Sequence, residues 1–135
     1  MKKLFTTFTL LFSTTILFSQ LISHTSVRVN DEDREGYLEL ESFWSEIHEQ
    51  AIEDGYAQRW MVWEFIYKDE EDSKGKPDFF IMNFYKDSLQ KSKSANINPK
   101  DYARKVYKVK LSKSKFEKKW NLPKGQRNFY ELQRL

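Results

Sequence analysis

Hydrophobic and polar positions along the chain predict six regular elements, beginning with a strand and a helix. Residues 22–29 alternate between inward and outward positions, as a half-buried strand does. From Tyr37 onward the apolar residues recur at spacings of three and four, which predicts an amphipathic helix that ends at Gly55. Its apolar stripe consists of Tyr37, Leu40, Trp44, Ile47 and Ala51, and its opposite face consists mainly of glutamates.

Two further strands are predicted by apolar residues that occupy both of their faces. Residues 56–67 place Trp60 on one face and Trp63 on the other, and residues 79–85 are almost entirely apolar. Residues 68–78 lie between them and are too polar for burial, so they predict a solvated hairpin connection. Strands that are apolar on two faces need cover on both.

The C-terminal third is basic and predicts a helix followed by a strand. Residues 86–98 are rich in Lys and Ser and are consistent with a short helix. Residues 98–101, Asn-Pro-Lys-Asp, resemble a helix start, and the apolar residues behind them predict one long basic helix to about Trp120. In residues 107–111 apolar residues alternate with lysines, so a strand is the alternative there. A Pro-Lys-Gly sequence then interrupts the pattern, and residues 128–135 predict the last strand.

The predicted order is strand, helix, strand, strand, helix, strand. This order is typical of a ferredoxin-like α+β fold, βαββαβ, with a four-stranded antiparallel sheet and two helices on one face. Residues 21–135 are enough for one such domain. The helices cover one side of the sheet only, so the apolar hairpin favours a second copy on the other side. We therefore expect a homodimer, a dimeric α+β barrel.

Residues 1–20 have the pattern of a signal peptide. Two lysines precede an apolar run over residues 4–18 that Thr and Ser interrupt, and Ser19-Gln20 closes it. A membrane-spanning helix needs about 20 predominantly apolar residues, so cleavage is favoured over anchoring. The absence of cysteine excludes a lipoprotein anchor and disulfides. We expect an exported, periplasmic or extracellular protein with no transmembrane segment after cleavage.

Composition and charge narrow the partners of the domain. The 22 aromatic residues are too many for a disordered chain. Residues 21–85 hold 16 acidic and 6 basic side chains, whereas residues 86–135 hold 15 basic and 4 acidic ones. These halves either form solvated faces or attract each other, within one fold or across a dimer. The basic half is a candidate for anionic lipid, and an exported protein is not expected to bind nucleic acid.

A longer pattern carries a resemblance to a known family. It consists of Tyr37-Leu38-Glu39-Leu40-Glu41, Phe43-Trp44, Ile47-His48, Gly55, Trp60, Trp63-Glu64 and Asn83-Phe84-Tyr85. The pattern resembles small, uncharacterised exported proteins of the dimeric α+β barrel superfamily from Bacteroidetes-like bacteria. The resemblance implies two sheets that close face to face. Members of the superfamily include antibiotic-biosynthesis-type monooxygenases, haem-degrading enzymes and stress proteins without known activity, so the fold implies no single activity.

Catalytic motifs are not found in the sequence. It lacks a Gly-x-Ser-x-Gly elbow, a P-loop and a dinucleotide-binding turn. His24 and His48 are the only histidines, too few good ligands for structural zinc without cysteine, so no metal site is predicted. Residues 69–72 are acidic but lack the spacing of a calcium loop and fit a solvated hairpin tip better. His48 is either a histidine beside the core stripe that bonds to a neighbour or, paired with Glu41 or a backbone oxygen, a proton shuttle or axial ligand.

The best candidates for a binding site are aromatic and amide side chains near the hairpin. They are His48, Trp44, Trp60, Trp63, Asn83 and Tyr85. A core or dimer-interface role is the alternative for the residues of the hairpin. The first functional hypothesis is a homodimer that binds a small apolar or aromatic molecule. The second is a monooxygenase-like or haem-related oxygenase, and the third is an envelope interaction protein. The sequence names no cofactor and does not decide whether the protein is an enzyme.

Overall fold

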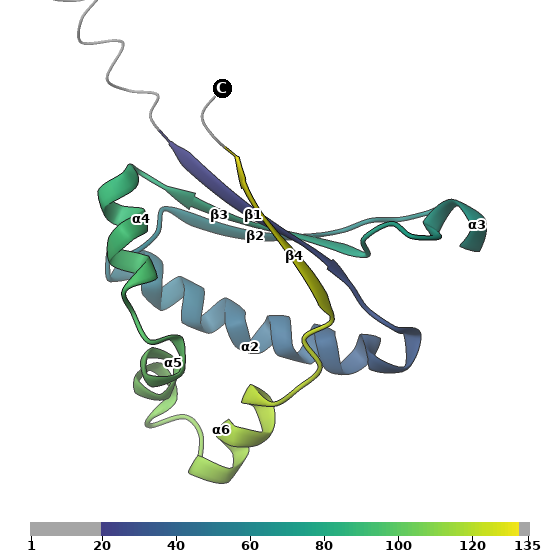
Figure 1. The fold of residues 1–135 in the computed structure, drawn as a ribbon. Helices are drawn as coiled ribbons and strands as arrows, with labels where there is room; N and C mark the ends of the chain where they lie inside the picture. Colours follow the sequence, from purple (N-terminus) through teal and green to yellow (C-terminus); the bar gives the residue numbers. More distant parts are fainter. Residues whose placement is uncertain (1–19, 133–135) are drawn as a thin grey trace, which may run out of the picture.

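The computed structural model describes residues 20–132, and they form one antiparallel sheet with helices on one side (Figure 1). The strands are β1 (Leu21–Arg28), β2 (Arg59–Glu64), β3 (Phe79–Tyr85) and β4 (Gln126–Leu132). Their order across the sheet is β2-β3-β1-β4, with every neighbouring pair antiparallel. This arrangement confirms the predicted ferredoxin-like α+β fold. Residues 1–19 of the predicted signal peptide and residues 133–135 of the predicted last strand lie outside the described residues.

The helices form two further layers on one side of the sheet (Figure 1). A single 3-10 turn, η2 (Asp31–Asp33), precedes α2 (Arg34–Glu53), which packs directly on the sheet. Beyond α2 lie α5 (Pro99–Tyr107) and α6 (Lys113–Trp120). Two shorter helices remain. α3 (Glu70–Ser73) lies at the tip of the β2–β3 connection, and α4 (Ser88–Ala95) lies next to the end of β3.

The prediction of one long C-terminal helix was wrong, because α5 and α6 are separate helices. The helical stripe continued past Tyr107 only if Lys113 joined it, and the chain turns at residues 108–112 instead. Asn98 caps α5 as predicted, and the Ser112 side chain caps α6 by accepting a hydrogen bond from the backbone N–H of Lys115. The break leaves Lys113 exposed and lets Phe116 fold back into the core. The alternative strand over residues 107–111 is also absent.

Two apolar clusters hold the layers together. Between the sheet and α2 lie Val27, Val29, Tyr37, Phe79 and Ile81. Between α2 and the α5–α6 pair lie Leu40, Phe43, Ile47, Ala103, Tyr107 and Phe116. The Phe43 and Tyr107 rings stack with centroids 4.6 Å apart, and the Tyr107 hydroxyl donates a 2.8 Å hydrogen bond to the Phe43 carbonyl oxygen. The helical layer is therefore fixed to α2 rather than to the sheet.

The acidic and basic halves of the chain attract each other within the fold. Lys119 Nζ lies 2.8 Å from Glu39 Oε1, and Lys110 Nζ lies 2.6 Å from Glu46 Oε2. Both pairs connect the C-terminal helical region to α2, and both are solvent-exposed. Exposed ion pairs of this kind contribute little to stability. The ion pairs between the two halves help to orient α5 and α6 on α2, whereas the apolar cluster between these helices supplies most of the stability.

The face of the sheet opposite α2 has no cover within the described part of the chain. The strand register aligns apolar side chains of three strands there, namely Ile22, Met61, Trp63, Phe80, Met82 and Phe84. Phe65, just past the end of β2, is 42% exposed and packs edge-on against Phe80. Trp63 is 54% exposed. An apolar surface of this extent is typical of an interface.

The β2–β3 connection is exposed, as its polarity predicted. The Asp69 side chain caps the one-turn helix α3, and Asp72 pairs with Lys76 at 2.6 Å. These acidic groups therefore have partners within the turn. Across the described residues no cluster of three or more His, Cys, Asp or Glu side chains is placed to hold a metal ion. In the same part of the chain, no helix is long and apolar enough to cross a membrane.

Candidate functional site

A cavity of about 110 Å³ lies between α2, the end of β3 and the connection from α4 to α5. Each of its three walls, on α2, β3 and α5, contributes an aromatic side chain. It is lined by Trp44, Ile47, His48, Ala51, Tyr56, Ala57, Asn83, Tyr85, Ser94, Ile97, Pro99 and Tyr102. The lining combines apolar surface with a few polar groups, which is the usual composition of a small-molecule site.

Helical and strand periodicity bring the lining residues together. On α2, Trp44, His48 and Ala51 lie at spacings of four and three, so they share one face. On β3, Asn83 and Tyr85 alternate with the residues of the open face and so point toward α2. One layer thus supplies the imidazole and the other supplies the amide and a phenol.

The third wall is fixed by a hydrogen bond between α5 and the end of α2. The Tyr102 hydroxyl donates to Asp54 Oδ2 at 2.7 Å, and the Tyr102 ring meets Tyr56 edge-on. Burial, followed by this contact with Asp54, raises the pKa of Tyr102. The hydroxyl therefore stays protonated at neutral pH and remains a donor.

His48 is the buried titratable group of the cavity. Its ring stacks on Trp60, with centroids 4.7 Å apart and planes inclined by 11°, and Trp44 lies on another side at 5.9 Å. Burial lowers the pKa of His48 to about 4, so the imidazole is neutral at pH 7. A neutral imidazole offers one hydrogen-bond donor and one acceptor.

The alternative pairing of His48 with Glu41 is not formed. Glu41 lies two turns before His48 on α2, beside the Tyr37 hydroxyl, and its Oε1 is 3.2 Å from Nη2 of Arg127 on β4. Burial raises the pKa of Glu41, although both neighbours favour its charged form. This ion pair connects α2 to the sheet edge and is not part of the cavity.

The structure brings most of the predicted site residues together. Trp44, His48, Asn83 and Tyr85 line the cavity, and Trp60 stacks behind His48. Trp63 does not line it, because it lies on the open face of the sheet. Sequence reasoning missed Tyr56 and Ile97. Tyr56 follows the end of α2, and Ile97 lies in a Lys- and Ser-rich stretch without a clear period.

Comparison with known proteins finds a solved structure with a similar fold. The chain is similar to a solved structure of a dimeric ferredoxin-like protein of unknown function from Jannaschia sp. CCS1, with a TM-score of 0.50. The match covers 85% of this chain and 99% of that one, at 10% sequence identity. This likeness concerns the fold alone. No family model and no curated protein matches the sequence.

The polar groups that line the cavity can donate and accept hydrogen bonds. They are a neutral imidazole, an amide, phenols and the Ser94 hydroxyl. A volume of about 110 Å³ is too small for a porphyrin, so the residues present do not fit a haem at His48. The cavity suits a molecule of about one aromatic ring, since a cavity of about 150 Å³ lined by apolar side chains holds benzene.

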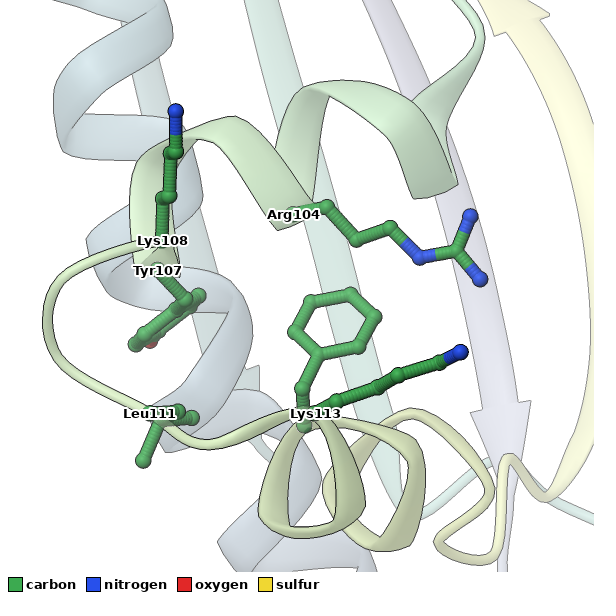
Figure 2. A pocket seen from close by; sticks show the side chains of 6 residues that line it. Arg104, Tyr107, Lys108, Leu111 and Lys113 are labelled. Atoms are coloured by element: carbon green, nitrogen blue, oxygen red, sulfur yellow. The ribbon is translucent and has the colours of Figure 1, made fainter.

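A second hollow lies between α5 and α6 (Figure 2). It measures about 340 Å³ and is lined by Arg104, Tyr107, Lys108, Leu111, Lys113 and Phe116. Three of these residues are cationic and three are apolar or aromatic. The first cavity and this hollow therefore differ in charge as well as in place.

Proposed function

We propose that the protein is an exported homodimer that binds a small apolar or aromatic molecule in the cavity between α2 and β3. The observation that carries this proposal is the convergence of His48, Asn83 and the cavity aromatics from different elements onto one partly open cavity. An apolar lining with a few convergent polar groups is the usual composition of a ligand site.

The neutral His48 gives the proposed ligand a polar contact without the cost of a buried charge. Because its ring is fixed against Trp60, the imidazole edge is held in one orientation. The Asn83 amide lies on the opposite wall of the cavity. A ligand with one ring and one hydroxyl, carbonyl or amine group suits both walls.

The homodimer is supported by the open face of the sheet. Trp63, Phe65 and Phe80 are apolar and have no cover from the helical layer, so burial against a second copy removes them from water. The similar protein from Jannaschia is described as dimeric. In the proposed dimer the two sheets face each other, and the helical layers lie outside.

Export is proposed from the sequence of residues 1–20 alone. The resemblance to exported proteins of Bacteroidetes-like bacteria also stays a prediction. Mass spectrometry of the protein recovered from the medium or periplasm tests the proposal. A chain that begins close to residue 20 is expected, whereas an intact Met1 in a cytoplasmic fraction contradicts it.

Ligand binding is tested with benzene and phenol as probes, by chemical shifts in two-dimensional NMR. We expect both probes to shift cavity residues, and phenol to shift the His48 ring signals more than benzene does. The variant Ala51→Leu fills the cavity from α2 and should abolish these shifts. Ala95→Leu makes the same change on an exposed helix position and should not. Equal shifts in both variants rule out this cavity as the site.

The dimer is tested by light scattering and sedimentation. Trp63→Glu places a charge on the open face and is expected to give a folded monomer. Leu89→Glu is the matched control, because Leu89 is 63% exposed on α4, away from that face. A wild-type monomer at all concentrations would overturn the dimer while leaving the cavity proposal intact.

A further inference from the structure

The turn between α5 and α6 exposes an apolar side chain among lysines. Val109 is 92% exposed, although a valine of the predicted helical stripe was expected to be buried. Residues 104–116, called here the basic tip, contain six basic side chains and no acidic one. The fold thus presents an apolar group at the centre of a cationic surface.

Some of the cations in the basic tip are neutralised by neighbours, but others are not. Arg104 pairs with Glu117 at 2.9 Å and with Asp101 at 3.3 Å, and Lys110 pairs with Glu46. The other four lysines of the basic tip form no ion pair with the part of the chain that the structure describes, and these are Lys105, Lys108, Lys113 and Lys115. Internal attraction therefore leaves positive charge available on both sides of Val109.

The hollow between α5 and α6 belongs to the same surface (Figure 2). Its apolar lining consists of Phe116, Tyr107 and Leu111, of which Phe116 and Tyr107 are each only 4% exposed and so form a buried floor. Arg104 and Lys113 extend to the same side, and Lys108 extends to another. The hollow itself therefore offers mainly positive charge, which complements an anionic headgroup, and the exposed apolar group of the basic tip is Val109.

We propose that the basic tip docks on an anionic lipid surface, with Val109 inserted between headgroups and the surrounding lysines bound to lipid phosphates. Each lysine close to such a surface contributes attraction that salt screens. The exposed valine distinguishes this partner from an ordinary polyanion, because a nucleic acid or an acidic polysaccharide offers it no apolar medium. An amphipathic surface of this composition is typical of proteins that lie on membranes.

The basic tip stays accessible in the proposed dimer. It lies in the outermost helical layer, on the far side of α2 from the sheet (Figure 1). A second copy that covers the open face leaves it exposed. Docking is therefore independent of the ligand cavity and of the dimer, and each proposal can fail alone.

Vesicle co-sedimentation tests the docking with the whole domain. We expect binding to phosphatidylcholine vesicles that contain phosphatidylglycerol, little binding to phosphatidylcholine alone, and loss of most binding in about 0.5 M NaCl, where charges are screened within a few ångströms. Equal binding to both kinds of vesicle, or none to either, overturns the proposal.

Two variants locate the contact. Lys108→Glu with Lys113→Glu should weaken binding to anionic vesicles at least about tenfold, whereas Lys74→Glu, an exposed change on the β2–β3 connection, should change it little. Val109→Ser should weaken it roughly fivefold and leave binding to a DNA duplex unchanged. If Val109→Ser has no effect on vesicle binding, or weakens DNA binding equally, lipid is not the partner. Unchanged thermal unfolding confirms that each variant is folded.

Discussion

The two faces of the sheet have similar sequence patterns but different surroundings. Phe79 and Phe80 are neighbours on β3, and strand geometry points them to opposite faces. Phe79 is 1% exposed beneath α2 and stacks near Tyr37, whereas Phe80 is only partly buried, beside His24 and Phe65. An apolar strand residue shows that a face needs cover, but the rest of the chain determines whether that cover is internal.

Paired substitutions at these two positions give the largest expected difference. Phe79→Ala should lower the free energy of unfolding by about 3 to 5 kcal/mol, because it leaves a cavity in a packed core. Phe80→Ala should cost about 1 kcal/mol or less in a monomer, since its ring is already partly in water. Chemical denaturation measures both losses.

Protein concentration separates an internal core from an interface. The loss in Phe79→Ala should be the same at every concentration, whereas the loss in Phe80→Ala should increase with concentration as dimers form in the wild type. A Phe80→Ala loss that does not change with concentration would mean that the open face is not a dimer interface.

The helix-covered side also contains the Glu41–Arg127 ion pair, and breaking it should lower stability less than Phe79→Ala does. Arg127→Met removes the cation beside the buried Glu41 carboxylate and should cost about 2 kcal/mol at pH 7. Adding Glu41→Gln to Arg127→Met should recover most of this loss in denaturation at pH 7. No recovery would mean that Arg127 acts through packing of its stem rather than through charge.

Acid should destabilise the helix-covered side through His48. The pKa of His48 is about 4 in the folded protein and about 6.5 in the unfolded chain, so the unfolded state takes up the proton first. Stability is complete above about pH 6.5 and falls as the pH falls toward 4, with a loss of about 2 kcal/mol between about pH 7 and pH 5.

The His48→Gln variant isolates this contribution. Glu41 opposes it, because burial raises the Glu41 pKa and so makes protonation more favourable in the folded state. Subtracting the denaturation curves of His48→Gln from those of the wild type removes the Glu41 contribution. A difference that is flat between pH 7 and pH 5 would contradict burial of a neutral imidazole.

The smallest effect is expected at the exposed pair between α6 and α2. Lys119→Met removes the partner of Glu39 and should change stability only slightly, because both side chains are solvated. The shift should shrink further in high salt. A larger loss in thermal unfolding would indicate that the segregated charges, rather than the apolar cluster, fix the helical layer.

Residue spacing predicted the strands and the first helix well, because each depends on a local period. Alternation placed Trp60 and Trp63 on opposite faces. Of the helical stripe, Tyr37, Leu40 and Ile47 are buried, and Trp44 is partly buried. The break between α5 and α6 was missed, since the apolar spacing continues across it. With the break, Phe116 packs against α2 while Lys113 stays in solvent. This packing depends on α2, which is distant in sequence.

The candidate site was predicted in part for a similar reason. Trp44 and His48 share a helical face, and Asn83 and Tyr85 share a strand face, so spacing alone grouped each pair. Tyr56 and Ile97 reach the cavity from the connections between elements, and Tyr102 reaches it from α5, whose position relative to α2 spacing does not determine. The partner of Glu41 was likewise out of reach, because Arg127 is far away in sequence.

The central position of β1 affects how the chain folds. β1 pairs along most of its length with β4, so that Thr25 lies opposite Phe129 from the other end of the domain. Contacts between residues this far apart in sequence form slowly, because a long loop must close first. We therefore expect the sheet to be completed only after the last strand is available. Until then β1 has a free edge, on which another chain can pair.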